Sequence, residues 1–178
     1  MKKNLLALCF MCCALLIGAG AVQAESVKVP VNKISDEGVG DAIGFITFTD
    51  DGKGGVDILM DVVGISEGQH GFHVHENPSC AAVEKDGKKV AGLAAGGHFD
   101  PDKTGKHEGP GKHGHKGDLP ALTADAKGEV KGKLHAPNLA VKDLKGRSVI
   151  IHAGGDNYSD QPAPLGGGGA RIACGVIN

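Results

Sequence analysis

The feature that most constrains the fold of this chain is a series of short runs rich in β-branched residues, separated by turn-forming triplets. The triplets at 36–38, 50–52 and 126–128 each end in glycine, and each separates two such runs. After Ala24, no stretch carries an apolar stripe with helical spacing over three turns. The sequence therefore predicts an all-β protein.

Eight strands account for these runs and predict an antiparallel sandwich or flattened barrel. Because only 3% of the residues are aromatic, Val, Ile, Leu and Ala must supply most of the core. A helical turn is expected within residues 138–145, and no linker divides the chain, so one domain is expected. The predicted strands are residues 27–34, 42–49, 56–63, 71–76, 119–125, 129–135, 148–152 and 171–177.

Residues 1–24 have the organisation of a secretory signal peptide. Two lysines precede an apolar run at 5–17, and 21–24 reads Ala-Val-Gln-Ala, a small-x-small pattern that signal peptidase cleaves. A membrane anchor is the alternative, but the run is shorter than the ~20 residues that a bilayer span needs. We therefore expect cleavage after Ala24 and a mature domain of residues 25–178 with no membrane segment.

Cleavage changes two quantities that bear on function. The whole chain has a formal net charge of -2, and the leader removes two lysines and no acidic residue, which leaves -4. A slightly acidic chain gives no support for nucleic-acid binding. Three of the five cysteines are also removed, and the remaining pair, Cys80 and Cys174, is expected to form one disulfide in an exported protein.

Two segments between the predicted strands are longer than a sandwich requires. Residues 77–118 and 153–170 are rich in Gly, Pro, Asp and His, and loops of this length in a compact domain are usually functional. The chain has nine histidines, and most of them lie in or beside these two loops. The chemistry of the protein is therefore expected there.

The histidines form the pattern of a metal site. His73 and His75 alternate with Val74 on a predicted strand, so both imidazoles point to one face. Alone, such a pair is as easily a solvated strand surface, but further histidines and an aspartate follow from separated segments. Three imidazoles with a carboxylate suit tetrahedral zinc, and imidazoles alone suit copper(II). The zinc-type set is His98, His107, His115 and Asp118, and the copper-type set is His73, His75 and His152.

Five segments resemble the signatures of the copper-zinc superoxide dismutase family. They are Gly-Phe-His-Val-His-Glu at 71–76, Gly-His-Phe-Asp-Pro at 97–101, His-Lys-Gly-Asp-Leu at 115–119, Ile-His at 151–152 and Gly-Ala-Arg-Ile-Ala-Cys-Gly at 169–175. They follow the family's order, and residues 154–169 resemble its bacterial periplasmic branch. The resemblance implies an eight-stranded Greek-key sandwich or flattened barrel, a periplasmic location, and antioxidant dismutation of superoxide to O2 and hydrogen peroxide.

The resemblance also implies roles for individual residues. His73, His75, His98 and His152 match the copper ligands, while His98, His107, His115 and Asp118 match the zinc ligands. His98 would thus bridge both metals and carry a proton to the departing peroxide. Arg171 matches an arginine that docks the substrate anion. Asp156 matches a carboxylate that links one histidine of each metal, although the neighbouring Asp160 competes for that role.

Other functions fit the sequence less well. A periplasmic copper and zinc store without turnover is the main alternative, and it leaves Arg171 without a role. No His-Glu-x-x-His motif occurs, which argues against a zinc hydrolase, and a blue-copper carrier would need one of the paired cysteines as a ligand. The remaining histidines, His70, His113 and His135, are expected to be exposed. The sequence does not distinguish a monomer from a homodimer.

Overall fold

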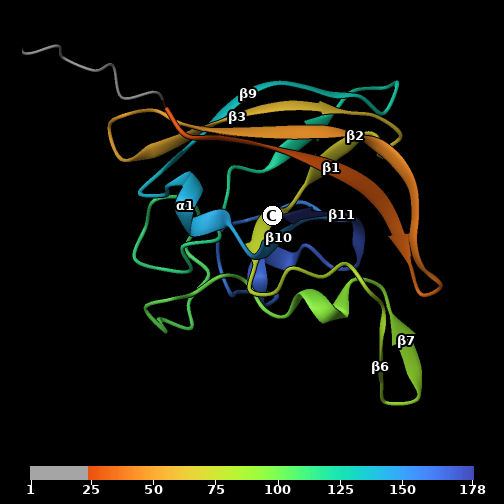
Figure 1. Ribbon diagram of the computed structural model, residues 1–178. Coiled ribbons are helices and arrows are strands. Elements are labelled where there is room, and N and C mark those ends of the chain that lie inside the picture. Colours follow the sequence, from red (N-terminus) through yellow and green to blue (C-terminus); the bar gives the residue numbers. More distant parts are fainter. Residues whose placement is uncertain (1–23) are drawn as a thin grey trace, which may run out of the picture.

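The computed structural model describes residues 24–178, which consist almost wholly of strands and loops (Figure 1). The predicted signal peptide lies outside the described residues except for Ala24. In the described part of the chain, no helix is long and apolar enough to cross a membrane. The all-β prediction is confirmed.

The main element is a curled antiparallel sheet of seven strands in the order β5-β10-β11-β1-β2-β3-β9. Its long strands form the upper layer in Figure 1, and β10 and β11 lie beneath them. The sheet curls because strands twist, so its two ends enclose the core. The bounds are β1 (Ser26–Ser35), β2 (Gly38–Asp50), β3 (Gly55–Val62), β5 (Phe72–His75), β9 (Val130–Pro137), β10 (Arg147–His152) and β11 (Arg171–Ile177).

Two short strand pairs and three helical turns complete the described structure. Strand β4 (Gly68–His70) pairs with β8 (Leu122–Ala124), and β6 (Val83–Lys85) pairs with β7 (Lys88–Val90) in a hairpin that projects from the sheet (Figure 1). The expected helical turn is present as α1. The helical turns are α1 (Val141–Leu144), η1 (Leu93–Ala95) and η2 (Leu165–Gly167).

The prediction of eight strands is wrong in number, since the described residues contain eleven. The three missed strands, β4, β6 and β7, have only three residues each. The β6–β7 hairpin turns at Asp86 and Gly87, both with positive φ, which is the Asp-Gly signature of a tight hairpin. Charged side chains flank that turn instead of alternating apolar ones, so the sequence does not distinguish the hairpin from the rest of the 77–118 loop.

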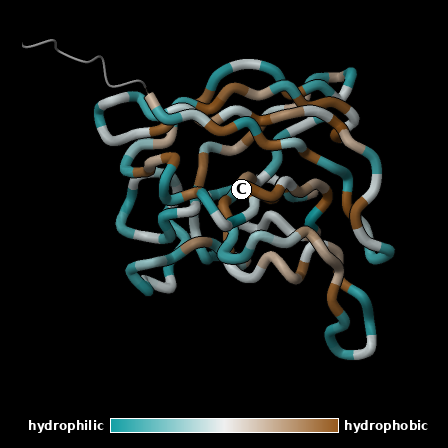
Figure 2. The backbone as a smooth tube through the Cα atoms, in the orientation of Figure 1, coloured by the Kyte–Doolittle hydropathy of each residue, from teal (hydrophilic) through white to brown (hydrophobic). Residues whose placement is uncertain are grey.

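The core follows from the alternation of side chains along the strands. In β3, Val56, Ile58 and Met60 are buried, whereas Leu59 between them is exposed. Hydrophobic residues accordingly follow the strands, and hydrophilic ones gather in the outer loops (Figure 2). Fully burying one such aliphatic side chain stabilises the fold by about 1.5–3 kcal/mol. The inward face therefore fixes the register of the sheet on which the long loops are held.

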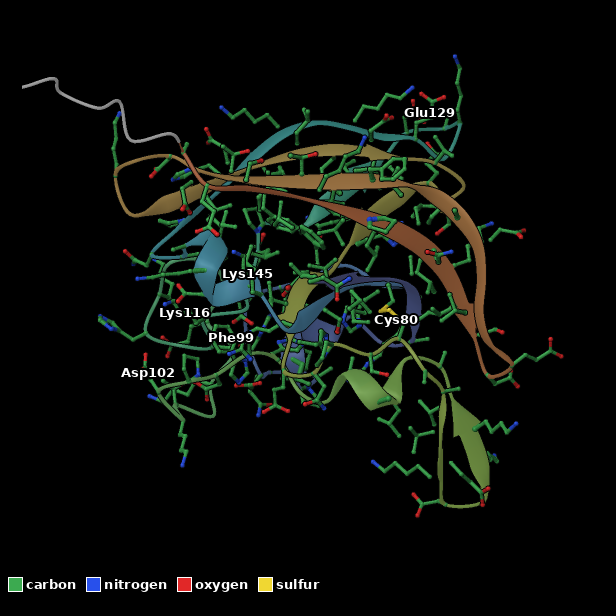
Figure 3. All side chains as sticks on the ribbon, in the orientation of Figure 1. Cys80, Phe99, Asp102, Lys116, Glu129 and Lys145 are labelled. Atoms are coloured by element: carbon green, nitrogen blue, oxygen red, sulfur yellow. A yellow bond between two sulfur atoms is a disulfide. The ribbon has the colours of Figure 1, made fainter. Side chains whose placement is uncertain are left out.

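The predicted disulfide between Cys80 and Cys174 is present, with a Cα–Cα distance of 5.7 Å (Figure 3). It joins the 77–118 loop to β11. Both cysteines are buried in a small cluster with Ile34, Ala95 and Ile150. The disulfide thus anchors a long loop to the strand that begins with Arg171.

Candidate metal centre

The strand β5 points His73 and His75 toward one side and Val74 toward the other, as predicted. Val74 belongs to the main hydrophobic core, and all three residues are fully buried. The two imidazole centroids are 6.4 Å apart. A His-x-His pair on this strand therefore faces the long loops instead of solvent.

Backbone pairing to β5 draws two segments of the 77–118 loop against these histidines. His98 lies opposite His75, and Asp118 lies opposite His73, each in an isolated antiparallel bridge. The amide of Val74 donates to the carbonyl oxygen of Gly117 at 2.8 Å. A Cβ at Gly117 would lie 2.3 Å from the Val74 carbonyl oxygen, so this close approach requires glycine.

The strand β10 supplies His152 from the other side of β5. Its residues Ser148 to Ile151 pair with β5, and the amide of His152 donates to the carbonyl oxygen of Gly71 at 2.9 Å. A register shift in the β10–β11 ladder after Ile151 places His152 opposite Arg171. The irregularity therefore brings a histidine and an arginine from two neighbouring strands to the same place.

The four histidines of the predicted copper set lie together. Each can direct one nitrogen so that all four atoms are within 4.8 Å of one another. Their other ring nitrogens have fixed partners: His75 Nδ1 is 3.0 Å from the Gly96 carbonyl oxygen, and His152 Nδ1 is 3.3 Å from that of Gly169. The remaining atoms, His73 Nδ1, His75 Nε2, His98 Nε2 and His152 Nε2, are buried without a hydrogen-bond partner.

The predicted zinc set lies directly beside the first. Asp118 is 3.0 Å from both His98 Nδ1 and His107 Nδ1, and 3.4 Å from His115 Nδ1. A set of four ligand atoms within 4.8 Å contains His73 in place of His115. However, His73 Nε2 is paired with Asp156 and its unpaired Nδ1 already belongs to the four-histidine cluster, whereas His115 Nδ1 is buried without a hydrogen-bond partner and belongs to neither group. His115 is therefore the better fourth donor.

Asp156 and Asp160 have different partners. The two oxygens of Asp156 accept hydrogen bonds from His73 Nε2 at 2.7 Å and from His107 Nε2 at 2.8 Å. Asp160 instead accepts the backbone N–H of His107 at 3.0 Å. Only Asp156 therefore connects a histidine of one set with a histidine of the other. Partners of this kind fix the tautomer and orientation of metal-binding imidazoles.

Burial and charge favour neutral imidazoles on one side of the centre and a cation on the other. Burial lowers the pKa of His98 to about 4 and that of His152 to about 3, so both are neutral, as metal binding requires. Burial also opposes a charge on His107, but its contacts with the carboxylates of Asp118 and Asp156 outweigh it and raise its pKa to about 9. Two buried carboxylates thus favour positive charge at this position, which a proton supplies on the free ring and a bound metal ion can supply in its place.

Arg171 is held beside the four-histidine cluster by two backbone carbonyl groups. Its guanidinium donates to the carbonyl oxygens of Gly92 at 2.5 Å and Gly96 at 2.7 Å. The Gly96 carbonyl group also contacts His75, so the arginine and one cluster histidine share a partner. The side chain is half-buried, which leaves part of it accessible to a small anion.

One expectation for the other histidines is wrong. His113 and His135 are exposed as predicted, but only 1% of His70 is exposed. Its Nδ1 lies 2.7 Å from the His152 carbonyl oxygen, and its Nε2 lies 2.8 Å from that of Ser66. The alternation His70, Phe72, Val74 could have signalled burial, since the last two are core residues. His70 thus contacts the backbone carbonyl group of His152 and helps to hold that residue in place.

The donor atoms fit two metal ions. Six buried ring nitrogens of the described residues lack hydrogen-bond partners, and they belong to the six histidines of the two predicted sets. Unpaired buried polar atoms are costly, so their convergence indicates a ligand. Four imidazoles suit copper, and three imidazoles with a carboxylate suit zinc.

Comparisons with known proteins agree with this chemistry. A family model described as copper/zinc superoxide dismutase matches residues 42–177. A Cu-Zn superoxide dismutase of Escherichia coli K12 is 48% identical over 165 residues, which cover 92% of this chain and 94% of the relative. One from Brucella abortus is 48% identical over 169 residues, covering 94% and 97%.

Solved structures give the same result. A Cu/Zn superoxide dismutase from Brucella abortus superimposes with a TM-score of 0.84 and 50% identity, covering 86% of this chain and 100% of that one. A copper, zinc superoxide dismutase from Salmonella enterica, described as monomeric, has a TM-score of 0.77 and 48% identity at the same coverage. The likeness therefore extends to sequence and fold together.

Proposed function

The chain belongs to the copper/zinc superoxide dismutase family, and from this premise we propose how its residues divide the work. It is an oxidoreductase with copper and zinc as cofactors, and it converts superoxide to O2 and hydrogen peroxide. When bound, copper supplies the one-electron redox chemistry, whereas zinc has no redox chemistry of its own.

We assign the two ligand sets as the sequence predicted them. The copper ligands are His73, His75, His98 and His152, and the zinc ligands are His98, His107, His115 and Asp118. The observation that carries this assignment is the placement of His98: its Nδ1 faces Asp118, while its unpaired Nε2 faces the other cluster. One imidazole can thus serve both ions. Asp156 accepts hydrogen bonds from His73 and His107 and so holds one histidine of each set in a fixed orientation.

Arg171 and His98 are the residues that we assign to catalysis. Superoxide is a small anion, and the fixed guanidinium of Arg171 offers it a cation beside the copper set. His98 Nε2, when it is not bound to copper, would accept a proton in one half of the cycle and return it to the departing peroxide in the other, and the second proton of hydrogen peroxide would come from solvent. Because the expected mature chain is negative overall, attraction of the substrate must be local.

A store of copper and zinc without turnover is not favoured by the comparisons, and it would give Arg171 no task. All the proposed ligands and Arg171 come from one chain, so the proposed site does not require a homodimer. The relatives described above are bacterial. We propose that residues 1–24 direct export to the periplasm and that residues 25–178 form the enzyme.

Metal analysis of selected variants tests the ligand assignment. His75→Ala should lose copper and keep zinc, whereas Asp118→Ala should lose zinc and keep copper, since each residue belongs to one set only. His113→Ala, at an exposed histidine of the same loop, is the control and should keep both metals and full dismutase activity. Loss of zinc from His75→Ala with copper retained would refute the assignment.

A further inference from the structure

The segment 156–160 crosses residues 107–109 of the other long loop and contacts them at several points. We propose that Tyr158 and Asp160 are positioning residues for the zinc site, which hold His107 and Asp118 through the backbone around them. The proposal rests on the zinc-ligand roles assigned above. Neither residue contacts the clustered donor atoms, so each acts through another residue.

Asp160 holds the backbone of His107. Its Oδ2 accepts the His107 amide at 3.0 Å, and its Oδ1 accepts the Leu165 amide at 3.1 Å. Both carboxylate oxygens are therefore used, and their amide partners lie in different loops, 77–118 and 153–170. Together with Asp156 at Nε2, this fixes His107 at its backbone and at its ring.

Tyr158 holds the residues on both sides of Asp118. Its phenol oxygen accepts the amide of Ala121 at 2.9 Å. Its ring packs on Gly109, where a Cβ would lie only 2.8 Å from the ring. The amide of Gly109 in turn donates to Asp118 Oδ2 at 3.3 Å. The Tyr158 side chain therefore supports Gly109, whose amide donates to Asp118, and also Ala121, which follows Asp118 in the sequence.

The backbone of Tyr158 indicates that this placement is imposed by its contacts. Its φ is +55°, a left-handed conformation that is unfavourable for a bulky residue and persists only where the surroundings enforce it. Its amide donates to Asp156 Oδ1 at 2.8 Å. More than a third of Tyr158 is exposed, so burial in the core does not explain the strain.

Two conservative variants and one control test the proposal in the holoenzyme. Tyr158→Phe keeps the ring on Gly109 but removes the acceptor for Ala121. Asp160→Asn keeps the shape but leaves one amide donor facing an NH2 group. Asp102→Asn makes the same chemical change at an exposed carboxylate of the 77–118 loop, which has no hydrogen bond to another described residue (Figure 3).

Zinc and copper retention are titrated with a chelator, and amide hydrogen exchange is followed at His107 and Ala121. Outer partners of metal ligands typically contribute 10–100-fold to metal affinity. We expect both variants to lose zinc at about tenfold lower chelator concentration, with copper retention unchanged. Exchange should accelerate at Ala121 in Tyr158→Phe and at His107 in Asp160→Asn, while Asp102→Asn behaves as wild type.

His107→Ala separates the two levels of the argument. If it loses zinc while Tyr158→Phe and Asp160→Asn retain zinc as wild type does, the positioning roles are overturned and the ligand assignment stands. If His107→Ala itself retains zinc as wild type does, the ligand assignment fails and the positioning proposal falls with it. Equal loss of copper and zinc from the two variants also overturns the proposal, because it would indicate general loosening.

Discussion

Reduction of the disulfide between Cys80 and Cys174 should cause a large loss of stability without removing any atom of the core. The bond joins residues 94 apart in the sequence, so it closes most of the expected mature chain into one loop. In the chain-entropy model, closing a loop of this length restricts the unfolded state by about 4–5 kcal/mol. Because measured disulfides often contribute less, we expect a loss of about 2–5 kcal/mol.

The assay is urea unfolding of the metal-free protein, with and without a thiol reductant. Metals are left out because they bind the folded state and would add their own linkage to the free energy of unfolding. The control is the double variant Cys80→Ala, Cys174→Ala, which should be as unstable as the reduced wild type and should not respond to reductant. Any change in the free energy of unfolding of this double variant on adding reductant measures an effect of the reductant that is unrelated to the disulfide.

The refuting result is a reduced wild type whose free energy of unfolding lies within about 1 kcal/mol of the oxidised form. Such a value would be far below the loop-closure expectation. It would mean that the unfolded chain already holds the two cysteines near each other, or that strain in the folded state offsets the constraint. The argument from sequence separation would then fail for this protein.

Three further substitutions have outcomes that follow from local geometry. Gly166→Ala would place a Cβ 2.7 Å from His107 Nε2, so zinc retention should fall at least tenfold. Gly105→Ala is the control and should keep zinc, because Gly105 has a similar φ but nothing within 4 Å of an added Cβ. Equal zinc retention in the two variants would contradict the clash. Arg171→Ala should lower kcat/KM for superoxide at least tenfold with copper content unchanged, and Arg171→Lys should recover part of the lost activity. Full activity of the alanine variant would exclude anion docking by Arg171. His70→Leu leaves the His152 carbonyl group buried without its partner and should lower the free energy of unfolding by about 1–3 kcal/mol, measured by urea unfolding. An unchanged free energy of unfolding would mean that this contact is incidental.

The sequence by itself determined the class of fold and the kind of chemistry. Alternation along β3 and the His-Val-His pattern of β5 depend on a period of two, which each strand carries locally. The disulfide followed from two cysteines in an exported chain. The donor types likewise indicated copper and zinc before any distance was known. Ligand chemistry also divided the histidines into two sets, but only the resemblance to a family implied that His98 belongs to both.

Only the tertiary structure decided which distant residues meet. Asp156 and Asp160 are equivalent carboxylates in the sequence, and backbone placement alone separates the bridge to His73 from the contact with the His107 amide. His70, at the end of β4, is buried and contacts the carbonyl oxygen of His152, the last residue of β10, which lies 82 positions away in the sequence. Such contacts are set by hydrogen bonds and packing between segments more than 40 residues apart, and no local period encodes them.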